Sequence, residues 1–450
     1  MYLSTETICA PITAPVSAAV GVIRLSGEKA LEITKQIFSK PDKIGHGKVV
    51  YGSLYYKGEL IDTCLVSYFK APRSYTGEDV VEISVHGSVS VMAHLLEVLI
   101  ELGARKAQPG EFTKRAFVNG KMDLTQAESV MELIDAQSDA ERKAASSHMG
   151  GATFKMTEEI RLSLLDIASA LGAYIDYPDE EIDELERSAI EASLADCLEK
   201  ANGLIERCKT GKVIKDGITT AILGKTNAGK SSLMNMLSGY DRSIVTDMEG
   251  TTRDLIENTV MLGSAKLILT DTAGLRKTDN KAEKIGIDLS ENAAKNASLC
   301  LCVFDLSRPL NEEDYRLEAL TKNQNRIGVF NKTDITSSDL SDMEKLFDKK
   351  VYISAKTGQG KDELTALISE MFLKGLPADG NVIMSARQYS QLIKMKEELS
   401  EAQNALKAGV TLDAVGVCID GAIDAAGEIT GHNVTEDTVH RIFERFCVGK

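Results

Sequence analysis

The sequence has no tryptophan, few aromatic residues (5%) and only eight prolines in 450 residues. With so few rings to bury, the core has to be filled by aliphatic side chains. Its eight cysteines form no CxxC pair and its six histidines show no metal-binding spacing, which indicates reduced thiols in the cytoplasm. No apolar run reaches the roughly 18 residues that a membrane span needs. We therefore expect a cytoplasmic protein with no membrane segment and no secretory leader.

Basic residues are outnumbered: 52 Lys and Arg stand against 67 Asp and Glu, a formal net charge of −15. This excess argues against binding nucleic acid through a broad basic surface, although a local basic groove stays possible. Hydrophobic residues (43%) and charged residues (26%) occur at the levels of a globular protein, which excludes a mostly disordered chain. The length predicts about three domains.

The hydrophobic pattern changes along the chain. Residues 1–120 hold short β-rich runs separated by helical stretches, which is typical of an α+β domain. Residues 121–212 are helical, strands and helices alternate over 213–377, and helical periodicity returns in 378–450. We predict an all-α helical domain interrupted by an inserted α/β domain with a doubly wound parallel sheet.

Two sets of apolar residues at helical spacing support the helical domain; they are Leu124, Ala127, Met131 and Ile134, and then Ile160, Leu164, Ile167, Leu171 and Ile175.

An acidic stretch at 179–186 follows Pro178. Paired carboxylates can form a metal or catalytic site, but acidic residues in a first helical turn after proline are what the helix dipole favours. We interpret the stretch as a helix start.

A phosphate-binding loop follows the predicted strand 218–223. Residues 224–231 are GKTNAGKS, the GxxxxGK[ST] pattern, and a helical segment comes next. The glycines let backbone N–H groups wrap around phosphates, and the helix N-terminus adds positive potential. Lys230 supplies a charge to the β- and γ-phosphates, and the Ser231 hydroxyl can bind Mg²⁺. A glycine-rich turn without function is the alternative interpretation.

Two further motifs complete a magnesium site. The GTTRD segment 250–254 provides Thr252 as a second hydroxyl ligand, and the DTAG segment 271–274 follows a predicted strand. Asp271 can hold Mg²⁺ through a water molecule, and the Gly274 amide can sense the γ-phosphate.

Two more motifs select the base. The NKTD segment 331–334 follows a strand, and the Asp334 carboxylate can accept both N–H donors of the guanine edge, which adenine lacks. The SAK segment 354–356 offers the Ala355 amide to the guanine carbonyl. Motifs in this order predict a GTPase, and Asp334 opposes an ATPase. The residues expected at GTP are Asn227, Ala228, Gly229, Lys230, Ser231, Ser232, Thr246, Asp247, Met248, Glu249, Gly250, Thr251, Thr252, Asp271, Thr272, Ala273, Gly274, Asn331, Lys332, Asp334, Ser354, Ala355 and Lys356.

The domain resembles the translation-factor-like GTPases, but Leu275 stands where Ras-like proteins carry the glutamine that orients water. Asn227 indicates a different means of promoting GTP hydrolysis. It is similar to the asparagine of potassium-activated GTPases, which helps bind a monovalent cation that neutralises charge beside the phosphates. A structural Asn227, or an arginine finger from Arg253 or Arg276, is the alternative.

The flanking segments narrow the resemblance. Segments similar to the MnmE (TrmE) family of tRNA-modification GTPases, within the TrmE-Era-EngA-like superfamily, cover essentially the whole chain; they are 20–27 (VGVIRLSG), 75–82 (YTGEDVVE), 109–117 (PGEFTKRAF), 123–135 (DLTQAESVMELID), 175–181 (IDYPDEE) and 446–450 (FCVGK). The resemblance implies an N-terminal domain that binds tetrahydrofolate and dimerises, and a GTPase domain inserted into a helical domain.

The resemblance also implies the reaction. The family acts with the FAD-containing flavoprotein MnmG, in a heterotetramer-type complex, on wobble uridine 34 of tRNA. Together they attach an aminomethyl or carboxymethylaminomethyl group to carbon 5, using 5,10-methylene-tetrahydrofolate as the one-carbon donor. The chain would be a homodimer whose GTPase domains meet when GTP, Mg²⁺ and K⁺ are bound. A regulatory GTPase switch in ribosome assembly, without modification chemistry, is the alternative.

By the same resemblance, Arg24, Glu82, Lys121 and Lys450 would contact the folate, and Cys447 would lie near the reacting centre. A folate tail is a polycarboxylate that suits Arg and Lys, and a pterin offers donors that suit a carboxylate. Without the resemblance, surface ion pairs and an inert thiol are the simpler interpretation.

The residues expected to act in catalysis are Glu283 and Lys230 in the GTPase domain and Cys447 at the folate site. Glu283 would orient the attacking water. The Mg²⁺ ligands would be Ser231 and Thr252, and the K⁺ ligands Asn227, Thr246, Met248 and Thr251.

Overall fold

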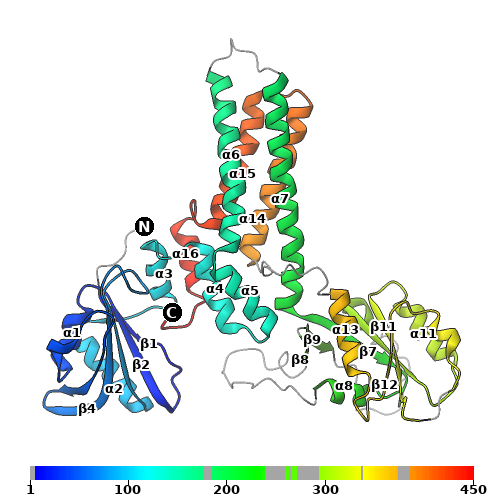
Figure 1. Cartoon of the computed structure of the whole chain (residues 1–450), viewed down its shortest axis with the longest axis horizontal. Coiled ribbons are helices and arrows are strands. Elements are labelled where there is room, and N and C mark those ends of the chain that lie inside the picture. The colour runs from blue at the N-terminus through cyan, green and yellow to red at the C-terminus, as the bar shows by residue number, and fades with distance from the viewer. Residues whose placement is uncertain are drawn as a thin grey trace. The chain divides into compact units, whose positions relative to one another are not determined.

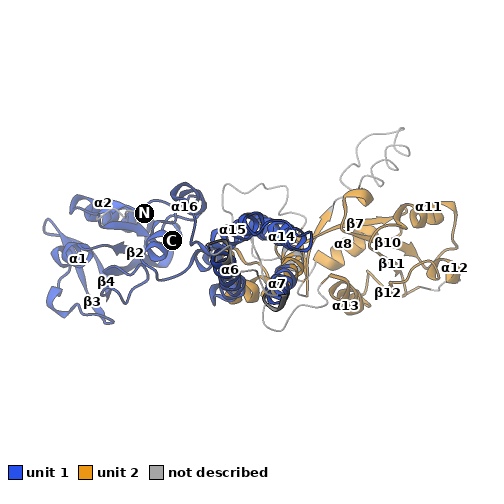
Figure 2. Ribbon diagram, turned by 90° about the horizontal axis from the view of Figure 1, so that it is seen from above, with its two compact units in different colours: residues 1–131, 148–201, 385–450 blue, residues 132–147, 202–384 orange. Residues whose placement is uncertain are grey.

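The structure is a computed structural model that describes residues 6–176, 184–238, 259–263, 265–270, 293–335, 338–372 and 385–450. The chain divides into two compact units (Figure 2), the first made of residues 1–131, 148–201 and 385–450 and the second of residues 132–147 and 202–384. The chain therefore leaves the first unit and returns to it twice. Among the described residues, no helix combines the length and the apolar character that crossing a membrane requires.

The amino-terminal part of the first unit is a six-stranded sheet in the order β3-β4-β5-β2-β1-β6. Its strands are β1 (Ile8–Pro11), β2 (Ala18–Ser26), β3 (Val49–Tyr56), β4 (Glu59–Phe69), β5 (Val80–Gly87) and β6 (Arg105–Lys106). Neighbouring strands are antiparallel except β1 and β6. The short helices η1 (Pro41–Lys43) and α3 (Glu111–Val118) flank the sheet.

Helices α1 (Ala30–Ile37) and α2 (Val89–Glu101) cover one face of this sheet (Figure 1). Every second side chain of β5 from Val81 onward packs into the core: Val81, Ile83 and Val85 are buried. Side chains of a strand alternate between its two faces, so Glu82 emerges on the face away from these helices. The register pairs Glu82 with Arg24 of β2, which brings an acid and a base together across the strands.

A buried charge fixes the loop between β4 and β5. The Arg115 side chain on α3 is 1% exposed, and its guanidinium donates to Glu78 at 3.0 Å and to Glu111 at 3.1 Å. Because an unpaired buried guanidinium is very costly, the pairing holds the loop carrying Glu78 against α3. This loop also carries Arg73 and Tyr75.

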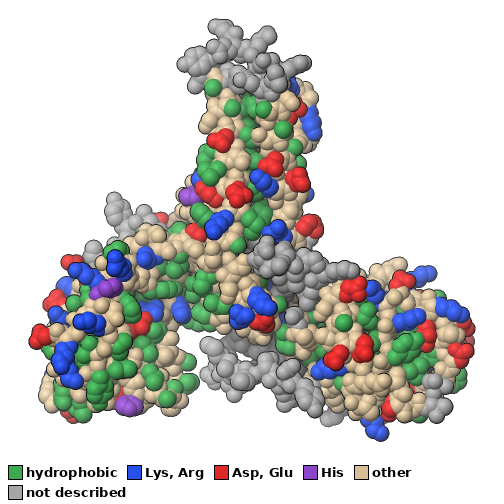
Figure 3. Space-filling view, viewed as in Figure 1, with side chains coloured by type: hydrophobic (Ala, Val, Ile, Leu, Met, Phe, Trp, Pro, Cys, Tyr) green, Lys and Arg blue, Asp and Glu red, His purple; other side chains and the backbone are tan. Residues whose placement is uncertain are grey.

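The helical part contains α4 (Leu124–Asp135), α5 (Asp139–Met149), α6 (Ala152–Asp176), α7 (Glu184–Asp216), α14 (Ala386–Lys407), α15 (Leu412–Thr430) and α16 (Glu436–Phe443). Helix α15 packs against both α6 and α14, although α6 lies more than 200 residues earlier in the chain (Figure 1). Figure 3 shows acidic and basic side chains interspersed over the visible face of this bundle.

The helices predicted from periodicity are confirmed. Leu124 and Ala127 are buried, as are Ile160, Leu164, Ile167 and Leu171. Ile134 departs from the prediction and is 47% exposed, because it lies in the last turn of α4, beyond the apolar contacts with α16. The Ile175 side chain and the start of the acidic stretch 179–186 lie outside the described residues.

The last residues of the chain dock beside the first strand. Apolar residues of α4 pack on those around α16; they are Leu124, Ala127 and Val130, and Val439, Phe443 and Phe446. Backbone bonds continue the contact, from Gly110 N to the Cys447 carbonyl (3.4 Å) and from Phe112 N to the Lys450 carbonyl (3.2 Å). At Gly449, a Cβ would lie 2.3 Å from the Pro11 carbonyl oxygen, so only glycine permits this approach.

The second unit holds a six-stranded sheet in the order β12-β11-β10-β7-β9-β8. Its strands are β7 (Ile218–Gly224), β8 (Thr259–Leu262), β9 (Ala265–Thr270), β10 (Leu299–Asp305), β11 (Arg326–Asn331) and β12 (Lys350–Ile353). Helices α8 (Lys230–Ser238) and α13 (Lys361–Phe372) cover one face, and α11 (Glu312–Thr321) and α12 (Ser341–Glu344) the other. Helices on both faces make the sheet doubly wound.

The predicted fold class, with its α+β, all-α and doubly wound α/β parts, is confirmed. The purely parallel sheet is corrected at one edge, where β8 runs antiparallel to β9. The pairing of Leu262 with Ala265 closes a tight hairpin, and Gly263 takes a φ of +60° there, so the chain reverses without a crossover helix.

Candidate functional sites

The phosphate loop joins β7 to α8 in the second unit. Its first glycine, Gly224, has a φ of +154°, and a Cβ there would lie 2.6 Å from the Val303 carbonyl oxygen. The Lys230 ammonium donates to the carbonyl oxygens of Gly224 (2.6 Å) and Lys225 (2.7 Å). Asn227 is exposed in the left-handed region at φ +64°. The loop therefore closes around its own lysine and presents Asn227 outward.

Asn331 joins this loop to the base-selecting segments. Its side-chain amide donates to the Ala228 carbonyl (2.9 Å), and its side-chain oxygen accepts from Ala355 N (3.0 Å) and Lys332 N (2.8 Å). A Cβ on Gly229 would stand 2.0 Å from the Asn331 amide nitrogen, so glycine is required there. One buried side chain thus connects the phosphate loop with both predicted guanine motifs.

Asp334 stands exposed beside this junction. Its Oδ1 accepts a hydrogen bond from the buried Ser354 hydroxyl at 2.7 Å. That bond, with the nearby charges of Lys356 and Lys332, holds the pKa of the Asp334 carboxyl below its usual range. An ionised, oriented carboxylate is what recognition of paired N–H donors requires.

The other predicted GTP residues divide into two groups. Ser231 and Ser232 lie exposed at the start of α8, where free backbone N–H groups and the helix dipole attract anions. The remainder lie outside the described residues; they are Thr246, Asp247, Met248, Glu249, Gly250, Thr251, Thr252, Asp271, Thr272, Ala273 and Gly274, together with Glu283, Leu275, Arg253 and Arg276.

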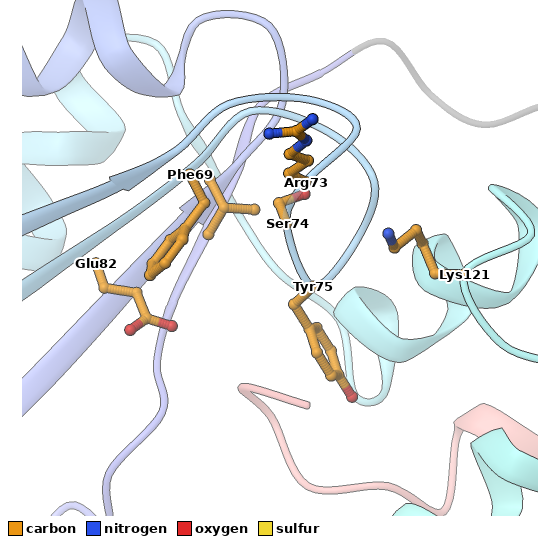
Figure 4. Close-up of a pocket in the computed structure, with 7 residues that line it drawn as sticks. Phe69, Arg73, Ser74, Tyr75, Glu82 and Lys121 are labelled. Atoms are coloured by element: carbon orange, nitrogen blue, oxygen red, sulfur yellow. The ribbon is translucent and has the colours of Figure 1, made fainter. Parts of the chain in front are cut away.

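A separate pocket of about 300 Å³ opens in the first unit (Figure 4). The residues that line it are Phe69, Arg73, Ser74, Tyr75, Val80, Glu82 and Lys121. Two of the four residues predicted to contact folate, Glu82 and Lys121, therefore face one cavity. The Lys121 ammonium is held by the Pro72 carbonyl at 3.0 Å.

Arg24 lies against this pocket. Its Nε and Nη2 atoms contact Oε1 of Glu82 at 2.9 and 2.8 Å, and its guanidinium lies 5.0 Å from the Tyr75 ring centre and 5.6 Å from that of Phe112. The third nitrogen, Nη1, is buried and has no hydrogen-bond partner within the described chain. A buried donor without a partner indicates a place for an acceptor on a ligand.

The docked chain end adds the remaining residues. Burial lowers the pKa of the Lys450 ammonium and the neighbouring Arg24 charge lowers it further, while Glu82 and Cys447 act in the opposite direction. These influences place Lys450 within electrostatic reach of Arg24, Glu82 and Cys447. Cys447 itself is exposed. Lys450 thus lies near the Arg24–Glu82 pair, of which Glu82 lines the pocket.

The sequence reasoning missed the aromatic residues around Arg24. Tyr75 and Phe112 lie inside the quoted segments 75–82 and 109–117, so their positions were available as a signal. Their contact with Arg24 depends on how α3 packs beside the sheet, and no local pattern predicts it. Arg73 and Phe69 were missed for the same reason.

The chain is similar over most of its length to known proteins. Residues 7–121 match the model of the GTP-binding protein TrmE N-terminus, and residues 124–447 match the MnmE helical domain. A tRNA modification GTPase MnmE from Roseiflexus sp. (strain RS-1) is 37% identical over 100% of both chains. One from Thermoanaerobacter pseudethanolicus is 38% identical over 99% of both chains. Aquifex aeolicus Era, in a crystal structure with GDP and AlF₄⁻, shows 25% identity and a TM-score of 0.27 over 40% of this chain and 66% of that one.

The fold and the nucleotide site define a GTPase of the P-loop class. The chain belongs to the MnmE family of tRNA modification GTPases. The predicted family and the predicted enzyme class, a hydrolase acting on GTP, are confirmed.

Burial predicts which thiols react in the native protein. It raises the pKa of Cys9 and Cys300 to about 11 and that of Cys64, Cys208 and Cys302 to about 12. Shifts of this size lower the thiolate fraction about 10²–10³-fold. We expect iodoacetamide at pH 8 to label the exposed Cys447 while these five thiols stay unlabelled, as measured by peptide mass spectrometry.

Cys447→Ser should remove the fast-reacting site, and urea should expose all the others. Native labelling of the five buried thiols as fast as Cys447 would contradict the packing described here.

Proposed function

We propose that this chain uses GTP hydrolysis to drive the modification of wobble uridine 34 in tRNA, and that it carries the one-carbon donor in its amino-terminal pocket. The observation that carries the proposal is a pocket lined by Glu82 and Lys121, with Arg24 paired to Glu82, in a chain that also has a GTPase site. A GTPase that acts only as a switch needs no such pocket. The product would be an aminomethyl or carboxymethylaminomethyl group on carbon 5.

The pocket suits a reduced folate. The unpaired Arg24 Nη1 and the ammonium groups of Lys121 and Lys450 can bind carboxylates, while Glu82 can accept from pterin N–H groups. Phe69 and Tyr75 offer flat apolar surface to a ring. Bound 5,10-methylene-tetrahydrofolate would supply the one-carbon unit. The residues of this chain would orient it, with Cys447 beside the reacting carbon.

On the GTPase side, Ser231 would bind Mg²⁺ together with Thr252, and Asp271 would act through water. Asn227 is exposed, and its side chain makes no hydrogen bond within the described residues, so its amide oxygen is available to K⁺. Thr246, Met248 and Thr251 would complete that ligand set. K⁺ would neutralise charge beside the phosphates, and Glu283 would orient water.

We further propose a homodimer that works in the cytoplasm with the FAD-containing flavoprotein MnmG in a heterotetramer-type complex on tRNA. The domain boundaries proposed with it are 1–120 for folate binding and dimerisation, 121–212 and 378–450 for the helical domain, and 213–377 for the GTPase domain. Two GTPase domains would meet across the dimer when GTP and K⁺ are bound.

Base choice is tested at Asp334. We expect Asp334→Asn to weaken GTP binding at least about 100-fold and to favour xanthosine triphosphate, because the amide can donate to the xanthine carbonyl that replaces the guanine amine. Titration with fluorescent nucleotides measures both affinities. Asp339→Asn, at an exposed carboxylate of the same domain that accepts from Ser341 N at 3.0 Å, is the matched control. Unchanged GTP affinity in Asp334→Asn would refute the guanine assignment.

The cation is tested by exchanging salts. We expect GTP turnover in KCl to exceed that in equimolar NaCl about tenfold or more, and Asn227→Ala to abolish the difference. Equal rates of GTP turnover in both salts would indicate that an arginine finger acts in place of K⁺. Arg253→Ala and Arg276→Ala, assayed separately in KCl, identify which arginine it is.

Hydrolysis and modification are separated by two variants. Glu283→Ala should lower kcat about 10²–10⁴-fold with little change in GTP affinity, and should lose tRNA modification as well. Cys447→Ser should hydrolyse GTP normally but form no modified uridine. GTP turnover and mass spectrometry of tRNA nucleosides measure the two activities. Normal modification by Cys447→Ser would remove this thiol from the chemistry and would leave the folate-site assignment at the end of the chain to Lys450 alone.

A further inference from the structure

One buried carboxylate lies between the two nucleotide-binding loops of the second unit. Asp305 is the last residue of β10, and its side chain is 5% exposed. The parallel register pairs it with Asn331 at the end of β11. The carboxyl ends of parallel strands meet at one edge of a doubly wound sheet, where ligands bind. Asp305 is therefore at the binding edge, although it belongs to none of the nucleotide motifs.

Asp305 holds the lysine of the NKTD motif. Its Oδ2 lies 2.7 Å from the Lys332 ammonium. Its Oδ1 accepts from the Ser307 backbone N–H at 3.0 Å and from the Ser307 hydroxyl at 2.6 Å, which fixes the carboxylate plane. Burial opposes ionisation, but Lys332 and Ser307 outweigh it, and the pKa of Asp305 lies below its usual range. The group is thus anionic at neutral pH.

The same carboxylate is linked to the phosphate loop. Arg308 Nε lies 3.4 Å from Asp305 Oδ2, and Arg308 Nη2 donates to the Thr226 carbonyl at 3.3 Å. Thr226 precedes Asn227 inside the loop. One anion therefore connects the lysine of the base-selecting segment with the loop that receives the phosphates.

We propose that Asp305 is a positioning residue for the nucleotide, which holds Lys332 and, through Arg308, the phosphate loop in their binding arrangement before the ligand arrives. This inference rests on the proposed role of residues 331–334 in guanine binding. Lysine has a flexible four-carbon stem, and fixing it in advance removes an entropy cost from the binding step. The backbone of Lys332 lies in the left-handed region at φ +73°. This conformation sets the direction in which the side chain leaves the end of β11, and the Asp305 carboxylate receives the ammonium there.

The test compares nucleotide dissociation from full-length variants by stopped-flow fluorescence. Asp305→Asn keeps the shape and removes the charge, and we expect fluorescent GDP and GTP analogues to dissociate about tenfold faster. Turnover at saturating GTP should stay within about twofold, because Asp305 does not contact the reacting groups. This split of KM from kcat separates positioning from catalysis.

The matched control is Glu318→Gln. Glu318 pairs with Arg326 at 3.0 Å, both side chains are 14% exposed, and Arg326 begins β11 at the end opposite to Lys332. The variant removes a comparable ion pair from the same sheet and should leave dissociation unchanged. Combining Asp305→Asn with Lys332→Met supplies a double-mutant cycle, in which Asp305→Asn should add no effect once the lysine is gone.

A milder variant keeps the test decisive if Asp305→Asn does not fold. Ser307 is exposed, and Ser307→Ala removes one donor to the carboxylate, so we expect dissociation about threefold faster. The inference is overturned if the Asp305 and Ser307 variants dissociate no faster than Glu318→Gln, or if the Asp305 and Lys332 effects multiply. A wild-type chain that binds no guanine nucleotide would overturn the proposed function together with it.

Discussion

Docking of residues 446–450 beside the first strand is the contact that brings the end of the chain to the amino-terminal sheet. Phe446 packs on Phe443 with ring centres 5.1 Å apart, and the backbone then bonds to Gly110 and Phe112. Gly449 is needed because a side chain there would collide with the Pro11 carbonyl. Without this docking, the Lys450 ammonium would not lie near the charges of Arg24 and Glu82.

Each candidate site contains a cation that a neighbouring carboxylate holds in place. In the first unit Glu82 holds Arg24, while in the second Asp305 holds Lys332. Partly buried ion pairs contribute little net stability, because desolvation offsets the Coulomb attraction. Their physical effect is to fix orientation, which lowers the entropy cost of binding. The buried set of Arg115, Glu78 and Glu111 does the same for the loop beside the pocket.

The features that could be predicted from the sequence are those that depend on a local pattern of residues. The predicted strand 218–223 agrees with β7, and the phosphate loop follows it as its glycines require. The short strands β1 and β6 escaped prediction, because four and two residues carry too little alternation to be distinguished from loop. The place of Tyr75 and Phe112 around Arg24 escaped as well, since it depends on contacts between segments distant in sequence. Asp305 is the last residue of β10, and its role emerges only from the register with β11.

Register explains why separate short motifs make one site. Gly224 pairs with Val303, Asp305 with Asn331, and Asn331 with Ile353. These pairings align the ends of four parallel strands, so the loops that follow them emerge at one edge. A slip of one residue would move each side chain to the opposite face and separate Asn331 from the Ala228 carbonyl and the Ala355 amide. Recognition of a nucleotide is thus set by strand pairing, and each motif supplies groups that the register has already brought within hydrogen-bond distance.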